Sequence, residues 1–152
     1  AGCLPASGST GSRRMSRRAE AFFDTNLLLY LLSDDAAKAD RAEELLAGGG
    51  VISAQVLNEF AAVARRKLAM PWPEIREVLA TVRAICAVEP VSAATHDLGS
   101  AIAERYRLTI YDGLIVAAAS LAGCGLLYSE DLQHGQNVHG VRVQNPFGLQ
   151  GA

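Results

Sequence analysis

Four acidic residues hold positions from which carboxylates commonly build an active site. Asp24 comes directly after a short apolar run, and Asp131 comes just after a second one. Both runs are predicted strands, and in open α/β sheets functional groups gather at the carboxyl ends of the strands. Asp112 lies in the first turn of a predicted helix, and Glu59 lies near the N-terminal end of another. We therefore expect the four carboxylates to meet at one edge of the sheet.

A cluster of this kind needs a positive partner. Two unit charges about 4 Å apart repel each other by about 4 kcal/mol at an effective dielectric constant of about 20. Protonation would relieve the repulsion, but Mg²⁺ or Mn²⁺ prefers oxygen ligands and keeps carboxylates ionised at neutral pH. The cluster therefore predicts a site for one of these metal ions.

Each acidic residue also has an ordinary structural explanation. Asp24 suits the N-cap of a helix, and Asp112 complements the dipole of the helix that it opens. Glu59 could be an exposed helix residue, and Asp131 could be a plain loop residue. No single residue is diagnostic, so the functional interpretation depends on all four together.

The elements that would position these residues follow from hydrophobic periodicity. Strands are expected at residues 19–23, 51–52, 87–88, 125–129 and 141–143. Helices are expected at residues 26–32, 36–46, 54–68, 93–106 and 111–122, and a further helix is expected to start at Pro71-Trp72-Pro73 and to run to about residue 85. Short apolar strands that alternate with helices predict an α/β fold with a parallel sheet covered on both faces.

Length and composition indicate one domain. Half of the 152 residues are apolar and a fifth are charged, as in ordinary globular proteins. Residues 1–14 are rich in Gly and Ser and precede Met15, so we expect an expression scar there and a single native domain over residues 15–152. Without Arg13 and Arg14 the formal charge changes from −2 to −4, so overall charge predicts no bulk attraction to nucleic acid.

The spacing of the cysteines and the length of the apolar runs indicate the cellular compartment of the protein. Cys86 and Cys124 stand alone in apolar contexts without a Cys-x-x-Cys spacing, which is typical of a reducing cytosol rather than a zinc site. Charged residues interrupt every run before the roughly 18 to 20 apolar residues that a membrane span needs. No secretory signal follows Met15. We expect a cytoplasmic protein with no membrane segment.

The acidic residues stand in four short motifs whose order resembles that of the PIN domain family, in particular the VapC-type toxins of bacterial toxin–antitoxin pairs. The motifs are Asp24-Thr25-Asn26, Asn58-Glu59-Phe60, Tyr111-Asp112-Gly113-Leu114-Ile115 and Ser129-Glu130-Asp131-Leu132. Each motif alone is weak, whereas four in order are specific. The resemblance spans the chain from Phe22 to about Phe147.

The resemblance implies a three-layer α/β/α fold with strand order 3-2-1-4-5 and a catalytic set of Asp24, Glu59, Asp112 and Asp131. Asp24 and Asp112 would bind Mg²⁺ or Mn²⁺ directly. The implied activity is endonucleolytic hydrolysis of RNA that leaves a 5′-phosphate and a 3′-hydroxyl. Metal ions perform this chemistry by activating water and stabilising the leaving oxygen, so no nucleophilic side chain is required.

Asn26 and Ser129 resemble the polar residues of the family that orient the carboxylates or contact phosphate, a common supporting role in metal sites. Gly113 stands where many relatives carry alanine, a departure that we expect to be tolerated. The resemblance also implies a homodimer and a cognate antitoxin protein as partners. The apolar run at residues 27–32 could serve these interfaces, or it could be internal core.

Other functions remain open at this stage. The chain could be a PIN-type RNA-processing nuclease without an antitoxin, or a catalytically silent binding module. A phosphotransfer domain with Asp24 as nucleophile is less favoured, because Asn26 stands where a second aspartate would be needed. The basic run at residues 65–67 suits a solvated helix end better than an RNA contact, although either is possible. His134 is close enough to Asp131 in sequence to line the cleft.

Overall fold

A computed structural model describes residues 21–148 of the chain. The predicted expression scar at residues 1–14 and the predicted native start at Met15 lie outside this range. None of the helices between residues 21 and 148 is both long and apolar enough to cross a membrane.

Six strands form one sheet in the order β3-β2-β1-β4-β6-β5. The strands are β1 (Ala21–Phe23), β2 (Gly50–Ser53), β3 (Cys86–Glu89), β4 (Leu126–Tyr128), β5 (Asn137–Val138) and β6 (Val141–Gln144). The five strands from β3 to β6 pair in parallel, which confirms the predicted α/β class and the order 3-2-1-4-5 with β6 as the fifth strand. The short β5 pairs antiparallel to β6 and was not predicted.

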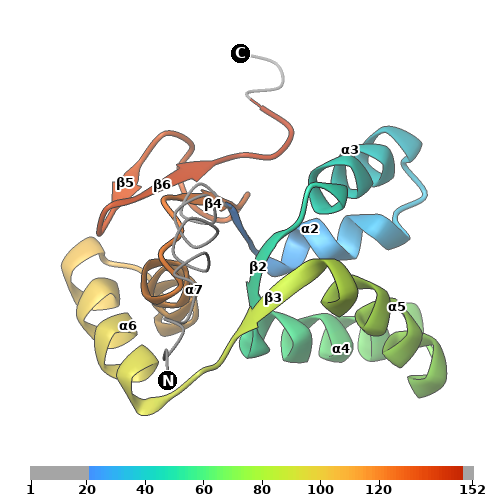
Figure 1. Cartoon of the computed structure of the whole chain (residues 1–152), viewed down its shortest axis with the longest axis horizontal. Coiled ribbons are helices and arrows are strands. Elements are labelled where there is room, and N and C mark those ends of the chain that lie inside the picture. Colours follow the sequence, from blue (N-terminus) through green and yellow to red (C-terminus); the bar gives the residue numbers. More distant parts are fainter. Residues whose placement is uncertain (1–20, 149–152) are drawn as a thin grey trace, which may run out of the picture.

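Helices cover both faces of this sheet. They are α2 (Thr25–Leu29), the 3₁₀ helix η1 (Tyr30–Leu32), α3 (Ala36–Ala47), α4 (Ala54–Leu68), α5 (Trp72–Ile85), α6 (Ala93–Tyr106) and α7 (Ile110–Leu121). In Figure 1, α6 and α7 lie on one side of the strands, and α2, α3, α4 and α5 lie on the other. The result is the three-layer arrangement expected for a parallel sheet that is apolar on both faces.

Side-chain caps explain why the helices that bear the acidic residues begin where they do. Ser53 caps α4 by accepting a hydrogen bond from the Val56 amide, as predicted. Thr109 caps α7 by accepting one from the Asp112 amide at 3.1 Å. Such caps satisfy amides that have no partner within the helix. The residue that caps α7 is therefore Thr109 and not Asp112.

The apolar run at residues 27–32 is buried to different degrees along its length. Leu27 and Leu28 are buried in the core, whereas residues 29–32 are only partly buried against it. The first part of the run thus belongs to the core, and the second part reaches the surface.

Gly113 allows α6 and α7 to approach each other closely. A Cβ atom built on Gly113 would overlap the backbone carbonyl oxygen of Gly99 and would lie 3.0 Å from the Cβ of Ala103. A Cβ on Gly99 would in turn lie 2.7 Å from the Leu114 side chain. Glycine at position 113 is therefore a packing requirement of this helix pair.

We expect Gly113→Ala to lower the free energy of unfolding by about 1–3 kcal/mol, because the added methyl group forces α6 and α7 apart. Urea denaturation of the wild-type protein and the variant measures this difference. Gly125→Ala is the matched control, since a Cβ at Gly125 meets no atom within 4 Å. Equal midpoints for Gly113→Ala and the wild type would contradict the close packing described here.

Candidate active site

The carboxyl ends of β1 and β4 bring together residues that are 105 positions apart. Phe23 and Tyr128 are register partners in the parallel pair, and the Asp24 amide donates to the Tyr128 carbonyl at 3.1 Å. The next residue after β4, Ser129, donates its hydroxyl to Asp24 Oδ2 at 2.8 Å. Both Asp24 and Ser129 are buried, so the sheet itself holds this pair in place.

Asp131 is tied to the same edge by two contacts. Its backbone amide donates to the Ser129 hydroxyl at 3.2 Å. The Asn26 side-chain amide donates to Asp131 Oδ1 at 3.2 Å and to Oδ2 at 3.3 Å. Asn26 therefore holds the carboxylate of an otherwise exposed residue near Asp24.

Glu59 joins the cluster from α4 through two residues that the sequence analysis did not single out. The Thr25 hydroxyl donates to Glu59 Oε2 at 2.6 Å, and Gln55 Nε2 donates to Glu59 Oε1 at 2.8 Å. Gln55 Nε2 also contacts the Tyr111 carbonyl oxygen at 3.2 Å, which links α4 to the start of α7. The spacing of four residues between Gln55 and Glu59 on one helix was the available signal.

The charges of Asp131 and Glu59 act on both Asp24 and Asp112. Burial raises the pKa of Asp24 from 3.8 to about 6; hydrogen bonds from Ser129 and Thr25 oppose this, and the charges of Asp131 and Glu59 add to it. Burial also raises the pKa of Asp112, and the negative charges of Asp131 and Glu59 raise it further, whereas a hydrogen bond with Thr109 lowers it. The fold thus keeps acidic groups together against their repulsion.

Three of the four acidic residues line a surface pocket of about 470 Å³. Its lining includes Asp24, Asn26, Glu59 and Asp131, together with Arg66 from α4 and Tyr111 from α7. Asp112 is not in the lining, although it adjoins Tyr111 and its carboxyl group responds to the charges of Asp131 and Glu59. His134, which the sequence allowed near the cleft, instead accepts a hydrogen bond from the Asn145 amide at 3.0 Å and is not in the lining.

The donor chemistry of the pocket fits a hard divalent cation. The raised pKa values of Asp24 and Asp112 reflect burial and mutual repulsion, both of which a bound cation would offset. Within residues 21–148, no three His, Cys, Asp or Glu side chains lie close enough to make a ready-formed metal site. Mg²⁺ usually takes one or two protein carboxylates and completes its shell with water. The residues therefore suit a largely hydrated ion rather than a closed coordination cage.

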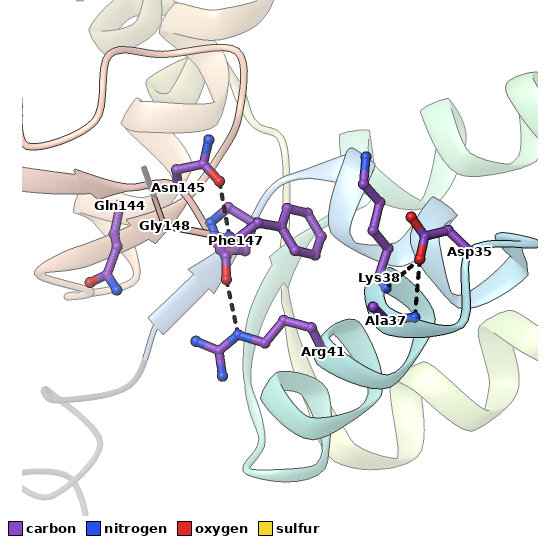
Figure 2. Close-up of a pocket in the computed structure, with 9 residues that line it drawn as sticks. Asp35, Ala37, Lys38, Arg41, Gln144, Asn145, Phe147 and Gly148 are labelled. Carbon is purple, nitrogen blue, oxygen red and sulfur yellow. Dashed lines mark hydrogen bonds between the residues drawn. The ribbon is translucent and has the colours of Figure 1, made fainter. Parts of the chain in front are cut away.

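A larger hollow of about 590 Å³ lies elsewhere, between α3 and the segment that follows β6 (Figure 2). Its polar groups are already engaged with the protein. Arg41 Nε donates to the Pro146 carbonyl at 2.9 Å, Lys38 Nζ lies 4.9 Å from the centre of the Tyr30 ring, and Asp35 caps α3. This hollow contains none of the four clustered acidic residues, so we assign the candidate site to the smaller pocket.

A family model described as the PIN domain matches residues 21–137. No curated protein sequence matches the chain significantly.

Several solved structures share the fold. A toxin–antitoxin complex from Klebsiella pneumoniae aligns with a TM-score of 0.65 and 20% identity, over 85% of this chain and 99% of that one. VapBC2 from Rickettsia felis, bound to a DNA fragment from its promoter, aligns with a TM-score of 0.59 and 18% identity, over 82% and 97% of the chains. VapC20 from Mycobacterium tuberculosis, a toxin that cleaves the sarcin–ricin loop, aligns with a TM-score of 0.53 and 20% identity, over 72% and 88%. At these identities the likeness is one of fold.

Proposed function

Because this chain belongs to the PIN domain family, we propose that it is a metal-dependent endoribonuclease and the toxin half of a type II toxin–antitoxin pair. The observation that carries the proposal is the convergence of Asp24, Glu59 and Asp131 on one pocket, with Asp112 close enough for the charges of Asp131 and Glu59 to raise its pKa. Clusters of carboxylates with perturbed pKa values are common at functional sites and costly elsewhere.

In this proposal Asp24 and Asp112 hold Mg²⁺ or Mn²⁺. When bound, such an ion lowers the pKa of water, polarises the phosphoryl oxygen and stabilises charge on the leaving oxygen. Water oxygen bonds to phosphorus as the bond to the 3′-oxygen breaks and that oxygen takes a proton, so the products carry a 5′-phosphate and a 3′-hydroxyl.

The supporting residues orient the carboxylates. Ser129 and the Thr25 amide fix the two oxygens of Asp24, at 2.8 and 2.7 Å. Thr25 and Gln55 hold Glu59, and Asn26 holds Asp131. The two hydrogen bonds to Asp24 lower its pKa and so favour its ionised form, which is the form that binds a metal ion.

The proposed substrate and partner draw support from the relatives. The Klebsiella structure is a toxin–antitoxin complex, and the Mycobacterium protein cleaves an RNA loop. By analogy, the chain would act on RNA, assemble as a homodimer and bind a cognate antitoxin in the cytoplasm.

Cleavage of a panel of RNAs by the purified chain, freed of any antitoxin, tests this proposal. We expect cleavage with Mg²⁺ or Mn²⁺, no cleavage in excess EDTA, and full recovery when metal is restored, because carboxylates alone cannot activate water sufficiently. End-labelling should find a 5′-phosphate on the downstream product. Equal cleavage in EDTA, or products with a 2′,3′-cyclic phosphate, would contradict the metal-assisted hydrolysis.

A further inference from the structure

Among the charged, polar and aromatic side chains that line the acidic pocket, two take no part in the network that holds the carboxylates. Arg66 lies seven positions after Glu59 on α4, about two helical turns, so both are on the same face. Although it lines the pocket, Arg66 forms no ion pair with the acids; the ion pair found among the described residues joins Arg41 and Glu44. Its neighbour Arg65 is occupied, since Nη1 donates to the Met70 carbonyl at 2.9 Å.

Tyr111 is the second of these residues. It is 65% exposed, more than any other large apolar residue within the described range. Gln55 Nε2 donates a hydrogen bond to the Tyr111 backbone carbonyl at 3.2 Å, whereas the Tyr111 ring stacks on no other ring in residues 21–148. Single exposed apolar residues are ordinary on protein surfaces. This one, however, lines the same pocket as the carboxylates of Asp24, Glu59 and Asp131, and its side chain is open to solvent.

We propose that Arg66 and Tyr111 form a clamp for one unpaired nucleotide of an RNA strand, an inference that rests on the proposed nuclease function. The Arg66 guanidinium binds a backbone phosphate, and the Tyr111 ring stacks on a base. Arginine suits the first role because its planar fork of donors matches phosphate oxygens and stays charged. A phosphate also needs a cation nearby to approach a pocket lined by Asp24, Glu59 and Asp131.

In this proposal the RNA strand continues along α4, away from the carboxylates of the acidic pocket. A hollow of about 320 Å³ adjoins the acidic pocket, because the two share Asn26, Leu29 and Val63 in their lining. Lys67 lines this second hollow, four residues beyond Val63 on the same helix. A neighbouring phosphate would meet the Lys67 ammonium there.

The clamp selects single-stranded RNA. A ring can stack on a base only when that base is released from its neighbours, as in loops, bulges and ends. In a continuous duplex every base is already stacked, so Tyr111 would gain nothing. We therefore infer cleavage within unpaired segments.

Binding of a fluorescently labelled, single-stranded RNA in Mg²⁺ tests the clamp separately from catalysis. The protein carries Asp112→Asn throughout, so that the probe is not consumed. We expect Tyr111→Leu to weaken binding about tenfold and Tyr111→Phe to keep it, because both rings stack. Arg66→Gln should weaken binding and reduce the slope of log Kd against log salt by about 0.7, the value for one phosphate contact on a single strand.

Matched controls separate the clamp from general effects of charge and aromaticity. Arg83→Gln removes the same charge from the exposed surface of α5, and Trp72→Leu removes an exposed ring that is 48% accessible. Neither lines the pocket, so neither should change the affinity. A paired RNA hairpin stem should bind more weakly than the single strand, and Tyr111→Leu should remove this preference.

The outcomes distinguish the clamp from the proposed function. Wild-type affinity in Tyr111→Leu, an unchanged salt slope in Arg66→Gln, or no RNA binding at all would overturn the clamp. The two variants could lose RNA affinity as expected while the protein with Asp112 intact never cleaves RNA. This result would support the clamp and overturn the proposed nuclease function. Circular dichroism of each variant excludes unfolding as the cause.

Discussion

Asp112→Asn is expected to lower the rate of RNA cleavage about a thousandfold, the largest effect on activity that this site predicts. A metal ion supplies several kcal/mol of stabilisation to the transition state, and each 1.36 kcal/mol lost costs a factor of ten. Asparagine keeps the size of the side chain and removes the charge that we propose binds the ion. Single-turnover cleavage with saturating Mg²⁺ measures the rate.

Asp40→Asn provides the matched control for this experiment. Asp40 is exposed on α3, remote in sequence from every motif of the site, and its substitution removes the same charge. We expect wild-type rates from it. Asp112→Asn should also fold normally, since it removes a carboxylate whose charged form burial and neighbouring acids already disfavour. Equal rates for Asp112→Asn and the wild type would remove Asp112 from the catalytic set.

Asp24→Asn is expected to stabilise the metal-free protein at neutral pH, even though it should abolish activity. Burial raises the pKa of Asp24 from 3.8 to about 6. Holding the buried carboxylate ionised at pH 7 therefore costs about 3 kcal/mol relative to the unfolded chain. Asparagine removes that cost and remains a good N-cap for α2, so we expect the free energy of unfolding to rise by about 1–3 kcal/mol.

The pH dependence of this effect follows from the sign of the pKa shift. A raised folded-state pKa means that the folded protein binds more protons than the unfolded chain between pH 3.8 and about 6. The contribution of Asp24 to stability therefore falls as the pH rises through that window and is constant above it. The advantage of Asp24→Asn should be complete above about pH 7 and absent below about pH 4.

Urea denaturation in EDTA at neutral and acidic pH measures this difference, with Asp40→Asn as the control for loss of one acidic charge. Addition of Mg²⁺ to the wild type at neutral pH should recover part of the lost stability, because the ion binds the folded form. It should do little for Asp24→Asn. A variant less stable than the wild type at neutral pH would show that the hydrogen bonds to Asp24 outweigh the cost of burying its charge.

The expected stabilisation also bears on the alternative of a silent binding module. A chain without catalytic function has no chemical reason to keep a buried, repelled carboxylate such as Asp24, because its replacement by asparagine is expected to raise stability. Asp24, Glu59, Asp112 and Asp131 are instead all present, and Ser129, Thr25, Gln55 and Asn26 donate hydrogen bonds to three of them. This pattern favours a site that is kept for its chemistry.

Local sequence signals predicted much of the fold. The alternation of short apolar runs and helical periodicity indicated a parallel α/β sheet, because burial on both faces produces continuous apolar strands. Ser53 marked the start of α4, because a cap acts on amides only two or three residues away. The positions of Asp24 and Asp131, just beyond two strand ends, indicated a shared edge. The strand order came from the resemblance to the PIN domain family and not from periodicity.

Tertiary structure alone decided how the site is assembled. The contact of Thr25 with Glu59, the bridge from Gln55 to the Tyr111 carbonyl and the close approach at Gly113 join segments far apart in the chain. No local pattern encodes them, because each depends on how whole helices pack against the sheet. For the same reason Arg66, which in the sequence resembles a solvated helix end, becomes part of the acidic pocket only when α4 packs against α2 and Gln55 joins it to the start of α7.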